Sequence, residues 1–426
     1  MKTNRSLSIA LAIICVVTLI GMACTPSSGP VSETTEKTIK IGLNLTFTGP
    51  AATTYAAMSK GPIEYFNYLN EELGGIEYKD PVTSESEKTK LHVIWEDGSM
   101  NVAKALTIYK RQKAEGVGLM IITGGSSVET ISSMASNDHM PLVGLYVTSA
   151  TAVSMAPNPL YYTSGQPDNV SYAGFGLRWI KDNWTEPGRP KVGCIMMDYP
   201  SQRVVQIPEG FPAYAEELGI DIVGIEFTPV TSTDFTVELT RLMSKEADYI
   251  LLGLSHGQVG ITLSDAERLG VKDKAKFIAI WTLDENLLRV AAPEAIDGLY
   301  GYTMVNFLDA DLPGVKLARE TIQKSRGEDI TSFELGGWCT AMIVATELKA
   351  TLEEAGYENL TGELINDSLH HITDLDTGGI IPLLTVDPEY PRLFKHAKML
   401  MNDKGTIKAI SDWTEIPELK EWMNLQ

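Results

Sequence analysis

The sequence predicts an α/β protein with two similar lobes, each built around a parallel sheet. Short apolar runs typical of buried strands alternate with longer segments whose apolar residues recur at helical spacing. This alternation occurs twice along the chain, with about four strands in each set. A length of 426 residues and a hydrophobic content of 44% are sufficient for two buried cores.

The first set of elements begins with a strand at residues 39–45, which Thr48-Gly49-Pro50 ends. A helix over residues 58–73 follows, and Gly74-Gly75 stops it. The rest of this set is predicted to be strands at 91–95, 118–122 and 141–145, and helices at 101–114 and 127–136.

The second set repeats the pattern from residue 191 onward. Its predicted strands lie at 191–197, 222–227, 249–254 and 277–281, and its predicted helices at 208–218, 235–245 and 259–269. A long apolar helix over residues 338–355 comes next, and strands return between residues 378 and 410.

The first residues of the chain have the organisation of an export signal. Lys2 and Arg5 supply positive charge, and the almost wholly apolar stretch 7–20 follows them. That stretch is shorter than the ~20 residues of a transmembrane helix. We therefore expect the protein to work outside the cytoplasm.

Cys24 follows small residues and precedes a polar segment, an arrangement that resembles a bacterial lipoprotein signal. The resemblance implies that residues 1–23 are removed, that Cys24 is lipidated and that the lipid anchors the protein to the membrane. Residues 24–38 are rich in Ser, Thr, Pro and Glu and are expected to form a flexible tether. An ordinary secretory signal and an uncleaved anchor are the alternatives.

Charge and cysteine content exclude some function classes. The net charge is −20, from 35 basic and 55 acidic residues, and a nucleic-acid partner would require a clustered positive surface. Cys194 and Cys339 lie in apolar sequence, which favours buried thiols over a disulfide. His370 and His371 are adjacent rather than at helical spacing, so we expect neither a metal nor a cofactor.

A candidate anion site follows two strands of the first set. Ser126 and Ser127 lie in a Gly-rich turn between a strand and a helix, where free backbone N–H groups favour an anion. Tyr146 and Thr148 follow the next strand in the same way. Because parallel strands end at the same edge of a sheet, these hydroxyls are expected to converge on one carboxylate. The alternative is ordinary capping of a helix without a ligand.

Further polar and aromatic residues stand where strands end. Tyr55 lies close to the end of the first strand, and strands of the second set are followed by Tyr199, His256, Trp281 and Asp284. Aromatic side chains at strand ends suit a small organic ligand held between two surfaces. Each residue taken singly is also consistent with packing or a turn.

The sequence gives little support to catalysis. No G-x-S-x-G motif marks a nucleophile. The segment Asp374-Leu375-Asp376 lacks the later ligands of an EF-hand. We therefore expect a binding protein rather than an enzyme, with an exported hydrolase as the remote alternative.

Taken together, the order and spacing of these segments resemble the branched-chain amino acid type of ABC-transporter solute-binding protein, which has the type I periplasmic binding fold. The resemblance covers residues 39–410. The segments that carry it are Ile39-Lys40-Ile41-Gly42, Thr48-Gly49-Pro50-Ala51-Ala52, Gly74-Gly75-Ile76, Trp95-Glu96-Asp97, Asn101-Val102-Ala103-Lys104-Ala105, Gly125-Ser126-Ser127, the segment around Thr148, Asn158-Pro159-Leu160-Tyr161-Tyr162-Thr163, Thr233-Asp234-Phe235 and Asp376-Thr377-Gly378-Gly379.

The resemblance implies two Rossmann-like lobes joined by a three-crossing hinge, with the ligand in the cleft between them. The first lobe is expected to comprise 39–160 and 288–378, the second 161–287 and 379–412, with a tail at 413–426. The protein would act as a monomer and deliver its ligand to an ABC permease. A ligand-sensing module of the same fold is the alternative.

The class of ligand stays open on the sequence alone. Where amino acid binders of this type place an acid for the ligand ammonium, this chain has Trp281 with Asp284 and Glu285 nearby. If Asp284 points away, an ammonium group would be buried without a partner, which is costly. The site would then favour an aromatic or aliphatic carboxylate, or an amide, over an amino acid.

Overall fold

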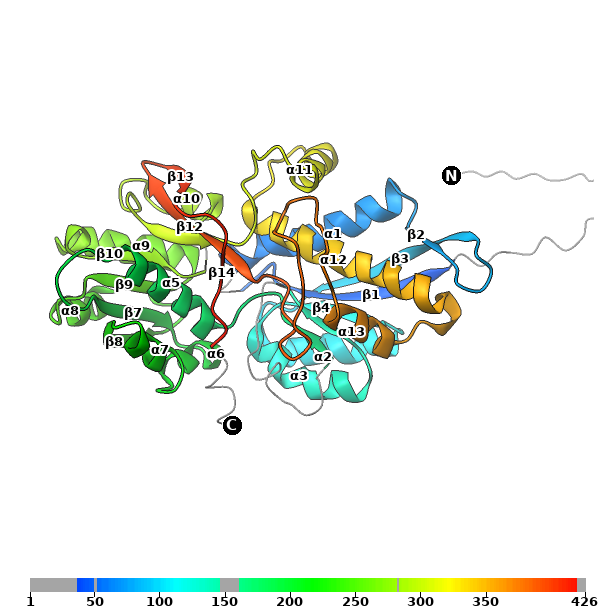
Figure 1. Ribbon diagram of the computed structural model, residues 1–426, viewed down its shortest axis with the longest axis horizontal. Coiled ribbons are helices and arrows are strands. Elements are labelled where there is room, and N and C mark those ends of the chain that lie inside the picture. The colour runs from blue at the N-terminus through cyan, green and yellow to red at the C-terminus, as the bar shows by residue number, and fades with distance from the viewer. Residues whose placement is uncertain (1–36, 50–51, 146–160, 282, 420–426) are drawn as a thin grey trace, which may run out of the picture. The chain divides into compact units, whose positions relative to one another are not determined.

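Two β-sheets flanked by helices organise the protein (Figure 1). The computed structural model describes residues 37–49, 52–145, 161–281 and 283–419. Within these ranges no helix is long and apolar enough to cross a membrane. The two-sheet arrangement confirms the predicted α/β architecture.

The first sheet has six strands in the order β2-β3-β1-β4-β5-β6. All neighbours are parallel except β2 and β3, and the register places Ile41 of β1 beside Val93 of β3 and Leu119 of β4. The strands are β1 (Thr38–Leu45), β2 (Ile76–Lys79), β3 (Ser86–Asp97), β4 (Leu119–Ile122), β5 (Leu142–Gly144) and β6 (Tyr162–Thr163). Strand β4 is buried along its whole length, as expected for a strand covered on both faces.

The described helices of the first lobe are α1 (Ala52–Glu71), α2 (Val102–Ala114), α3 (Gly125–Asn137), α11 (Pro313–Arg326), α12 (Ser332–Ala355) and α13 (Gly362–His370). Helices α1 and α12 cross at unusually close range because both carry glycine at the crossing. A Cβ on Gly61 would lie 2.4 Å from the Glu334 carbonyl oxygen, and a Cβ on Gly337 would lie 2.2 Å from the Met58 carbonyl oxygen.

The second sheet runs β13-β12-β11-β10-β9-β7-β8, and β14 pairs with β12. Strands β7 to β11 are parallel, whereas β12 and β13 are antiparallel additions at one edge. The strands are β7 (Lys191–Met197), β8 (Asp221–Thr228), β9 (Tyr249–Gly253), β10 (Lys276–Ala279), β11 (Tyr300–Thr303), β12 (His396–Asp403), β13 (Thr406–Ala409) and β14 (Thr414–Glu415).

The helices of the second lobe are α5 (Asn169–Asn183), α6 (Pro200–Arg203), α7 (Phe211–Glu217), α8 (Thr236–Met243), α9 (His256–Arg268) and α10 (Glu285–Val290). Short 3-10 turns occur at Val204–Gln206, Lys272–Lys274 and, in the first lobe, Tyr357–Asn359. Helix α9 begins with a capping box in which the side chains of Ser255 and Gln258 cap reciprocally.

The chain crosses between the lobes at three neighbouring places, which confirms the predicted hinge. The first and third crossings are hydrogen-bonded, because Ser164 N donates to Pro391 O at 2.8 Å and Leu393 N donates to Ser164 O at 2.9 Å. The second and third are linked by Asn306, whose backbone N donates to Ile380 O at 2.8 Å. The crossings therefore form one connected unit.

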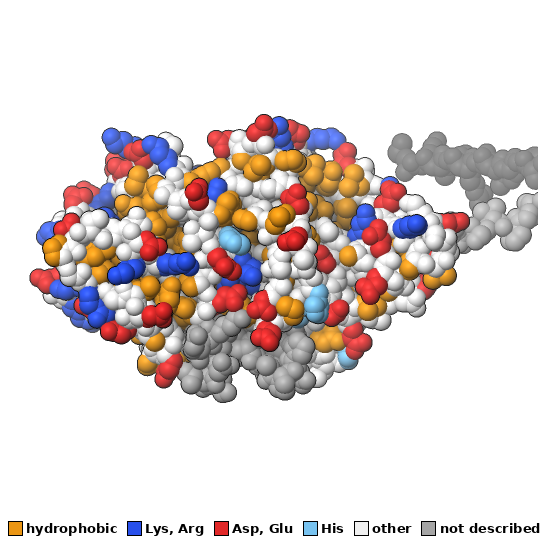
Figure 2. All heavy atoms as spheres, viewed as in Figure 1, with side chains coloured by type: hydrophobic (Ala, Val, Ile, Leu, Met, Phe, Trp, Pro, Cys, Tyr) orange, Lys and Arg blue, Asp and Glu red, His pale blue; other side chains and the backbone are white. Residues whose placement is uncertain are grey.

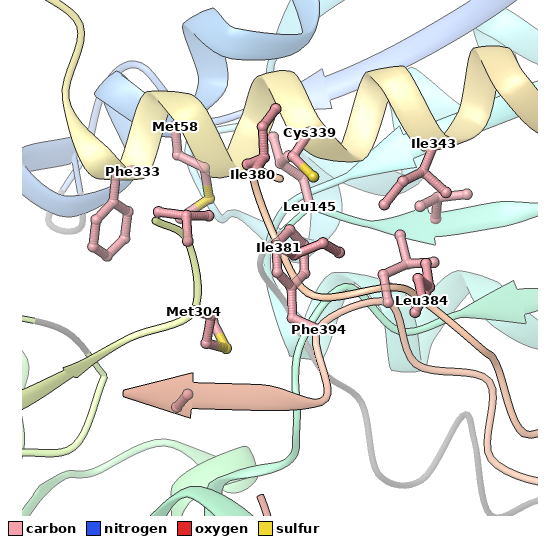
Figure 3. Packing of buried hydrophobic residues seen from close by; sticks show 14 of the residues in the cluster. Met58, Leu145, Met304, Phe333, Cys339, Ile343, Ile380, Ile381, Leu384 and Phe394 are labelled. Atoms are coloured by element: carbon pink, nitrogen blue, oxygen red, sulfur yellow. The ribbon is translucent and has the colours of Figure 1, made fainter. Parts of the chain in front are cut away.

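The core continues from the first lobe into the hinge (Figure 3). Cys339 and Ile343 of α12 lie above Ile380 and Leu384 of the third crossing, with Phe394 close by. Within the described residues Cys339 and Cys194 are free and buried, as the sequence predicted. Burial raises the pKa of both thiols, so they stay protonated.

Two lobe boundaries lie elsewhere than the sequence suggested. β6 pairs with β5 of the first sheet, although residues from 161 were assigned to the second lobe. β11 pairs with β10 and β12 of the second sheet, although 288–378 was assigned to the first lobe. The second crossing therefore comes after Thr303. The tail is packed as far as it is described, since Ile416 is fully buried.

Charged side chains of both signs are mixed on the face shown in Figure 2. Lys and Arg side chains are scattered among Asp and Glu side chains rather than gathered in one patch on this face. Many are paired locally, as Arg189 is with Glu216 and Asp221. The described side chains on this face therefore form no clustered positive surface of the kind that binding to phosphates requires.

Candidate ligand-binding cleft

A cavity opens between the two lobes at the ends of their strands. The empty space in and in front of it is about 840 Å³, which includes open solvent. Helices α1, α3 and α12 contribute from the first lobe, and the start of α5, α6 and Trp281 contribute from the second. The described lining residues are Thr54, Tyr55, Met58, Met100, Gly124, Gly125, Ser126, Ser127, Gln166, Pro167, Asn169, Tyr172, Met197, Tyr199, Ser201, Gln202, Trp281 and Phe333.

The lobes also touch each other around this cavity. Helix α3 contacts α6, and α1 contacts α9. Glu285 at the start of α10 accepts hydrogen bonds from Ser332 at the start of α12, from its backbone N at 3.0 Å and from its Oγ at 3.1 Å. A cleft bridged in this way is a closed one.

The N-terminus of α3 faces the cavity. Strand β4 ends at Ile122, and the turn at Gly124 has φ +92°, which only glycine adopts without strain. Because the N-cap residue of α3 is Gly124, no N-cap side chain bonds to the first N–H groups of the helix. The first N–H groups of a helix have no partner within the helix, so this end can receive an anion. Ser126 is half-buried and Ser127 is 1% exposed, and both line the cavity.

Trp281 is held in place by Asn169. Its indole Nε1 donates to Asn169 Oδ1 at 3.1 Å, and Asn169 Nδ2 donates to the Ser201 carbonyl oxygen at 2.7 Å. Trp281 is half-buried, so part of its ring is available to a ligand. Its polar atom is already used by the protein, which leaves the flat apolar surface of the ring as the part offered to the cavity.

Two tyrosines face each other across the cleft. Tyr55 comes from α1 and Tyr199 precedes α6, and both line the cavity. Burial raises the pKa of Tyr55, with a smaller contribution from the nearby Tyr199. Burial also raises the pKa of Tyr199. Both phenols are therefore neutral and can donate a hydrogen bond across the physiological pH range.

Asp284 and His256 lie behind the cavity wall and not among its lining residues. Asp284 is buried and caps α10, accepting from the backbone N of Asn286 and of Leu287 at 3.1 Å each. His256 Nε2 lies 3.2 Å from Asp284 Oδ1, and its ring stands edge-on to Phe333 at 5.3 Å. Phe333 is the residue of this group that reaches the cavity.

The structure also brings residues to the cleft that the sequence did not single out as site residues, chiefly Gln202, Thr54, Asn169 and Phe333. The position of Gln202, just after the strand-end residue Tyr199, is the one signal that could have found it. Of the predicted residues, Ser126, Ser127, Tyr55, Tyr199 and Trp281 meet in one cavity. Tyr146, Thr148 and the proposed lipidation site Cys24 lie outside the described residues.

Comparison with known proteins identifies the family to which this architecture belongs. A family model described as periplasmic binding protein matches residues 38–385. The chain belongs to the periplasmic binding protein family. No curated protein sequence matches this binding protein.

Solved structures share the fold of this binding protein across most of its length. A branched-chain amino acid ABC transporter protein from Thermus thermophilus with bound valine has TM-score 0.77 at 17% identity, covering 92% of this chain and 100% of the other. A solute-binding protein from Rhodopseudomonas palustris BisB5 in complex with 3,4-dihydroxy benzoic acid has TM-score 0.70 at 17% identity, covering 90% and 99%. A fatty acid ABC transporter protein from Thermomonospora curvata has TM-score 0.72 at 19% identity, covering 90% and 94%.

The described part of this binding protein contains no group of three or more His, Cys, Asp or Glu side chains that could hold a metal ion. Two acids near the cleft are held by protein groups, because Asp284 caps α10 and Glu285 bonds to Ser332. The arrangement is suited to enclosing a ligand between two surfaces.

Proposed function

We propose that this chain is an extracytoplasmic solute-binding protein that captures a small carboxylate-bearing ligand between its lobes and delivers it to an ABC importer in the membrane. It acts by binding alone, as a monomer, and performs no reaction. The supporting observation is a cavity lined from both lobes, with the start of α3 and the hydroxyls of Ser126 and Ser127 on one side.

The carboxylate is assigned to the α3 end of the cavity for electrostatic reasons. The N-terminus of a helix carries a partial positive charge, and its free N–H groups point along the axis. Ser126 and Ser127 add hydroxyl donors at the same place. The ligands named for two of the structural neighbours, valine and 3,4-dihydroxy benzoic acid, each carry a carboxylate.

Release and capture require the lobes to separate, and the hinge provides the means. The crossings are linked to one another by hydrogen bonds of Ser164 and Asn306. Opening would break the Glu285–Ser332 contact and expose the cavity. Two-lobed proteins of this kind close around ligands by rotation about a few hinge residues.

We further propose that Cys24 carries a lipid that anchors the protein to the extracytoplasmic side of the cell membrane. Intact-mass measurement of the protein extracted from its native membrane tests this directly. A mass matching residues 24–426 plus acyl chains is expected, and Cys24→Ser should abolish the acyl mass. An unmodified mature chain would contradict the anchor and leave the binding function untouched.

Native mass spectrometry of the purified protein tests the binding function. The expected result is a complex heavier than the bare chain, whose denaturation releases one small carboxylic acid. Delivery is tested by reconstituting the partner permease in vesicles, where the loaded protein should stimulate ATP hydrolysis. If a loaded protein leaves every ABC permease encoded beside it inactive, the transport role is wrong.

A further inference from the structure

The described lining of the cleft contains no ionic partner for a ligand amine. None of the described lining residues is Asp, Glu, Lys, Arg or His. The internal segments outside the description, 50–51, 146–160 and 282, contain none of these residue types in their sequence either. The walls are instead aromatic and neutral, with Tyr55, Tyr199, Trp281 and Phe333 as the large side chains.

The acids next to lining residues in the sequence are already bonded: Asp168 accepts from Tyr390, Asp198 from Arg203 and Glu334 from Arg326. The two acids that follow Trp281 are bonded as well. Asp284 accepts from two backbone N–H groups and from Asn286 Nδ2 at 3.0 Å, and it faces His256. Glu285 accepts from Ser332. Turning Asp284 toward the cavity would break its three hydrogen bonds and leave α10 uncapped. Turning Glu285 would break both of its bonds with Ser332. A ligand ammonium would therefore be buried against neutral groups, which is unfavourable.

Two buried polar side chains of the lining have no hydrogen-bond partner among the described residues. Gln202 is 1% exposed, and both its Nε2 and its Oε1 are unpaired. Thr54, on the opposite lobe, is 4% exposed, and its hydroxyl is unpaired. Buried polar groups of folded proteins are normally bonded, so such groups in a cavity wall indicate a bound partner. The Gln202 amide can both donate and accept.

The absence of a side chain at Gly253 leaves room for the side chain of Gln202. Gly253 at the end of β9 has no side chain, and a Cβ there would lie 3.0 Å from Gln202 Oε1. A larger residue would press on the amide. The side chain is therefore accommodated at the floor of the second lobe although nothing in the described protein bonds to it.

This inference rests on the proposed function and narrows its ligand. We propose that the cleft takes a carboxylic acid that has a flat apolar body and no amino group. The carboxylate lies at the start of α3 by Ser126 and Ser127, and the body lies against Trp281 and Phe333. A hydroxyl or carbonyl substituent of the ligand satisfies Gln202.

Isothermal titration calorimetry on the full-length protein tests this with matched probes that differ only in the amine. The pairs are phenylalanine and hydrocinnamate, tyrosine and phloretate, leucine and isocaproate, and valine and isovalerate. In every pair that binds, the acid without the amine is expected to bind at least ~10-fold more tightly. Phloretate, which has a hydroxyl, should bind more tightly than hydrocinnamate.

A variant that adds a negative charge to the cleft tests the preference for amine-free ligands by changing the protein instead of the ligand. Gln202→Glu places a carboxylate in the cleft and should shift the preference by ~10-fold or more toward the amino acid of each pair. Gln323→Glu adds the same charge on an exposed position of α11 and should leave the preference unchanged. An amino acid that binds wild-type protein as tightly as its amine-free partner overturns the inference.

Failure of the inference and failure of the proposed function give different results. If no probe binds but denaturation releases a small molecule from the protein, the proposed function holds. The presence or absence of an amino group on that molecule then decides the ligand class. If no probe binds and nothing is released, the binding function itself fails, and the ligand class fails with it.

Discussion

The indole Nε1 of Trp281 donates a 3.1 Å hydrogen bond to Asn169 Oδ1 in the wall of the cleft. Asn169 is the first residue of α5, and its Nδ2 is bonded in turn to the Ser201 carbonyl oxygen before Gln202. One asparagine therefore connects three separate segments of the second lobe that line the cavity. The orientation of the Trp281 ring depends on this connection.

Truncating Trp281 tests its role as an aromatic wall. Trp281→Ala should weaken binding of an aromatic acid more than binding of a small aliphatic acid, because the aromatic ligand loses a stacking surface worth about 0.5–1.5 kcal/mol beyond burial. Calorimetry with hydrocinnamate and isovalerate measures both losses. Equal losses would mean that Trp281 is part of the lobe wall and does not stack on the ligand. Asn169→Ala, which leaves the indole in place, should reproduce part of the aromatic loss.

Removing the hydroxyls at the start of α3 tests the carboxylate site. Ser126→Ala and Ser127→Ala should each weaken binding of a carboxylate ligand by about 1–3 kcal/mol if they donate to it. Ser133→Ala, on an exposed position of the same helix, is the matched control and should have no effect. Unchanged affinity in both test variants would show that the ligand carboxylate lies elsewhere.

The Glu285–Ser332 contact predicts a pH effect on stability. Burial, with the nearby charge of Asp284, raises the pKa of Glu285 above its ordinary value. The folded protein therefore holds this proton more tightly than the unfolded chain, and the associated stability is lost as the pH rises through the folded pKa. The difference in melting temperature between Glu285→Gln and wild type should therefore shift in favour of the variant as the pH is raised from about 4 to about 8. A difference that does not vary with pH would contradict the buried, protonation-sensitive contact.

His370 predicts a loss of stability in acid. Burial lowers its pKa to about 4 from 6.5, partly offset by the hydrogen bond between its Nε2 and the Tyr162 carbonyl oxygen. A histidine with a depressed pKa resists protonation in the folded state, so stability falls as the pH drops from 6.5 toward 4. The loss should be about 3 kcal/mol.

Urea denaturation at several pH values measures this loss. His370→Gln should flatten the acid side of the stability profile, whereas His371→Gln, at the exposed neighbouring residue, should leave it in place. If the His370 variant loses stability in acid as steeply as wild type, the buried imidazole is not the cause.

The crossing of α1 and α12 should not tolerate a side chain. Gly337→Ala places a Cβ about 2.2 Å from the Met58 carbonyl oxygen, which forces the helices apart. Overpacking of this kind costs about 1–3 kcal/mol or more, and thermal denaturation should show it. Gly257→Ala in α9, where a Cβ would meet nothing within 4 Å, is the control and should be neutral or stabilising. A Gly337→Ala protein as stable as wild type would contradict the close crossing.

Much of the fold follows from short apolar runs. β7 occupies the predicted residues 191–197, and the strands around it lie within a few residues of their predicted positions. Helix α5 was missed because it is buried along most of its length, so its apolar residues mark no single face. β11 was missed because Tyr300–Thr303 is short and contains glycine, and this shifted the predicted second crossing.

The candidate site was predictable only in outline. Strand-end reasoning led to Ser126, Tyr199 and Trp281, because the topology alone brings such residues to one edge. It could not tell that Asp284 turns to cap α10, since either orientation suits the sequence. Nor could it reveal that Gln202 is unpaired, because pairing depends on neighbours distant in the chain.

The central claim is that a small acid lies between the lobes. A crystal structure of the protein with its tightest-binding probe tests this most directly. The account predicts density in the cleft, with a carboxylate by Ser126 and Ser127, a flat body against Trp281, and Gln202 bonded to the ligand. Density at another site, or a ligand in the cleft that leaves Gln202 unpaired and the start of α3 empty, would contradict it.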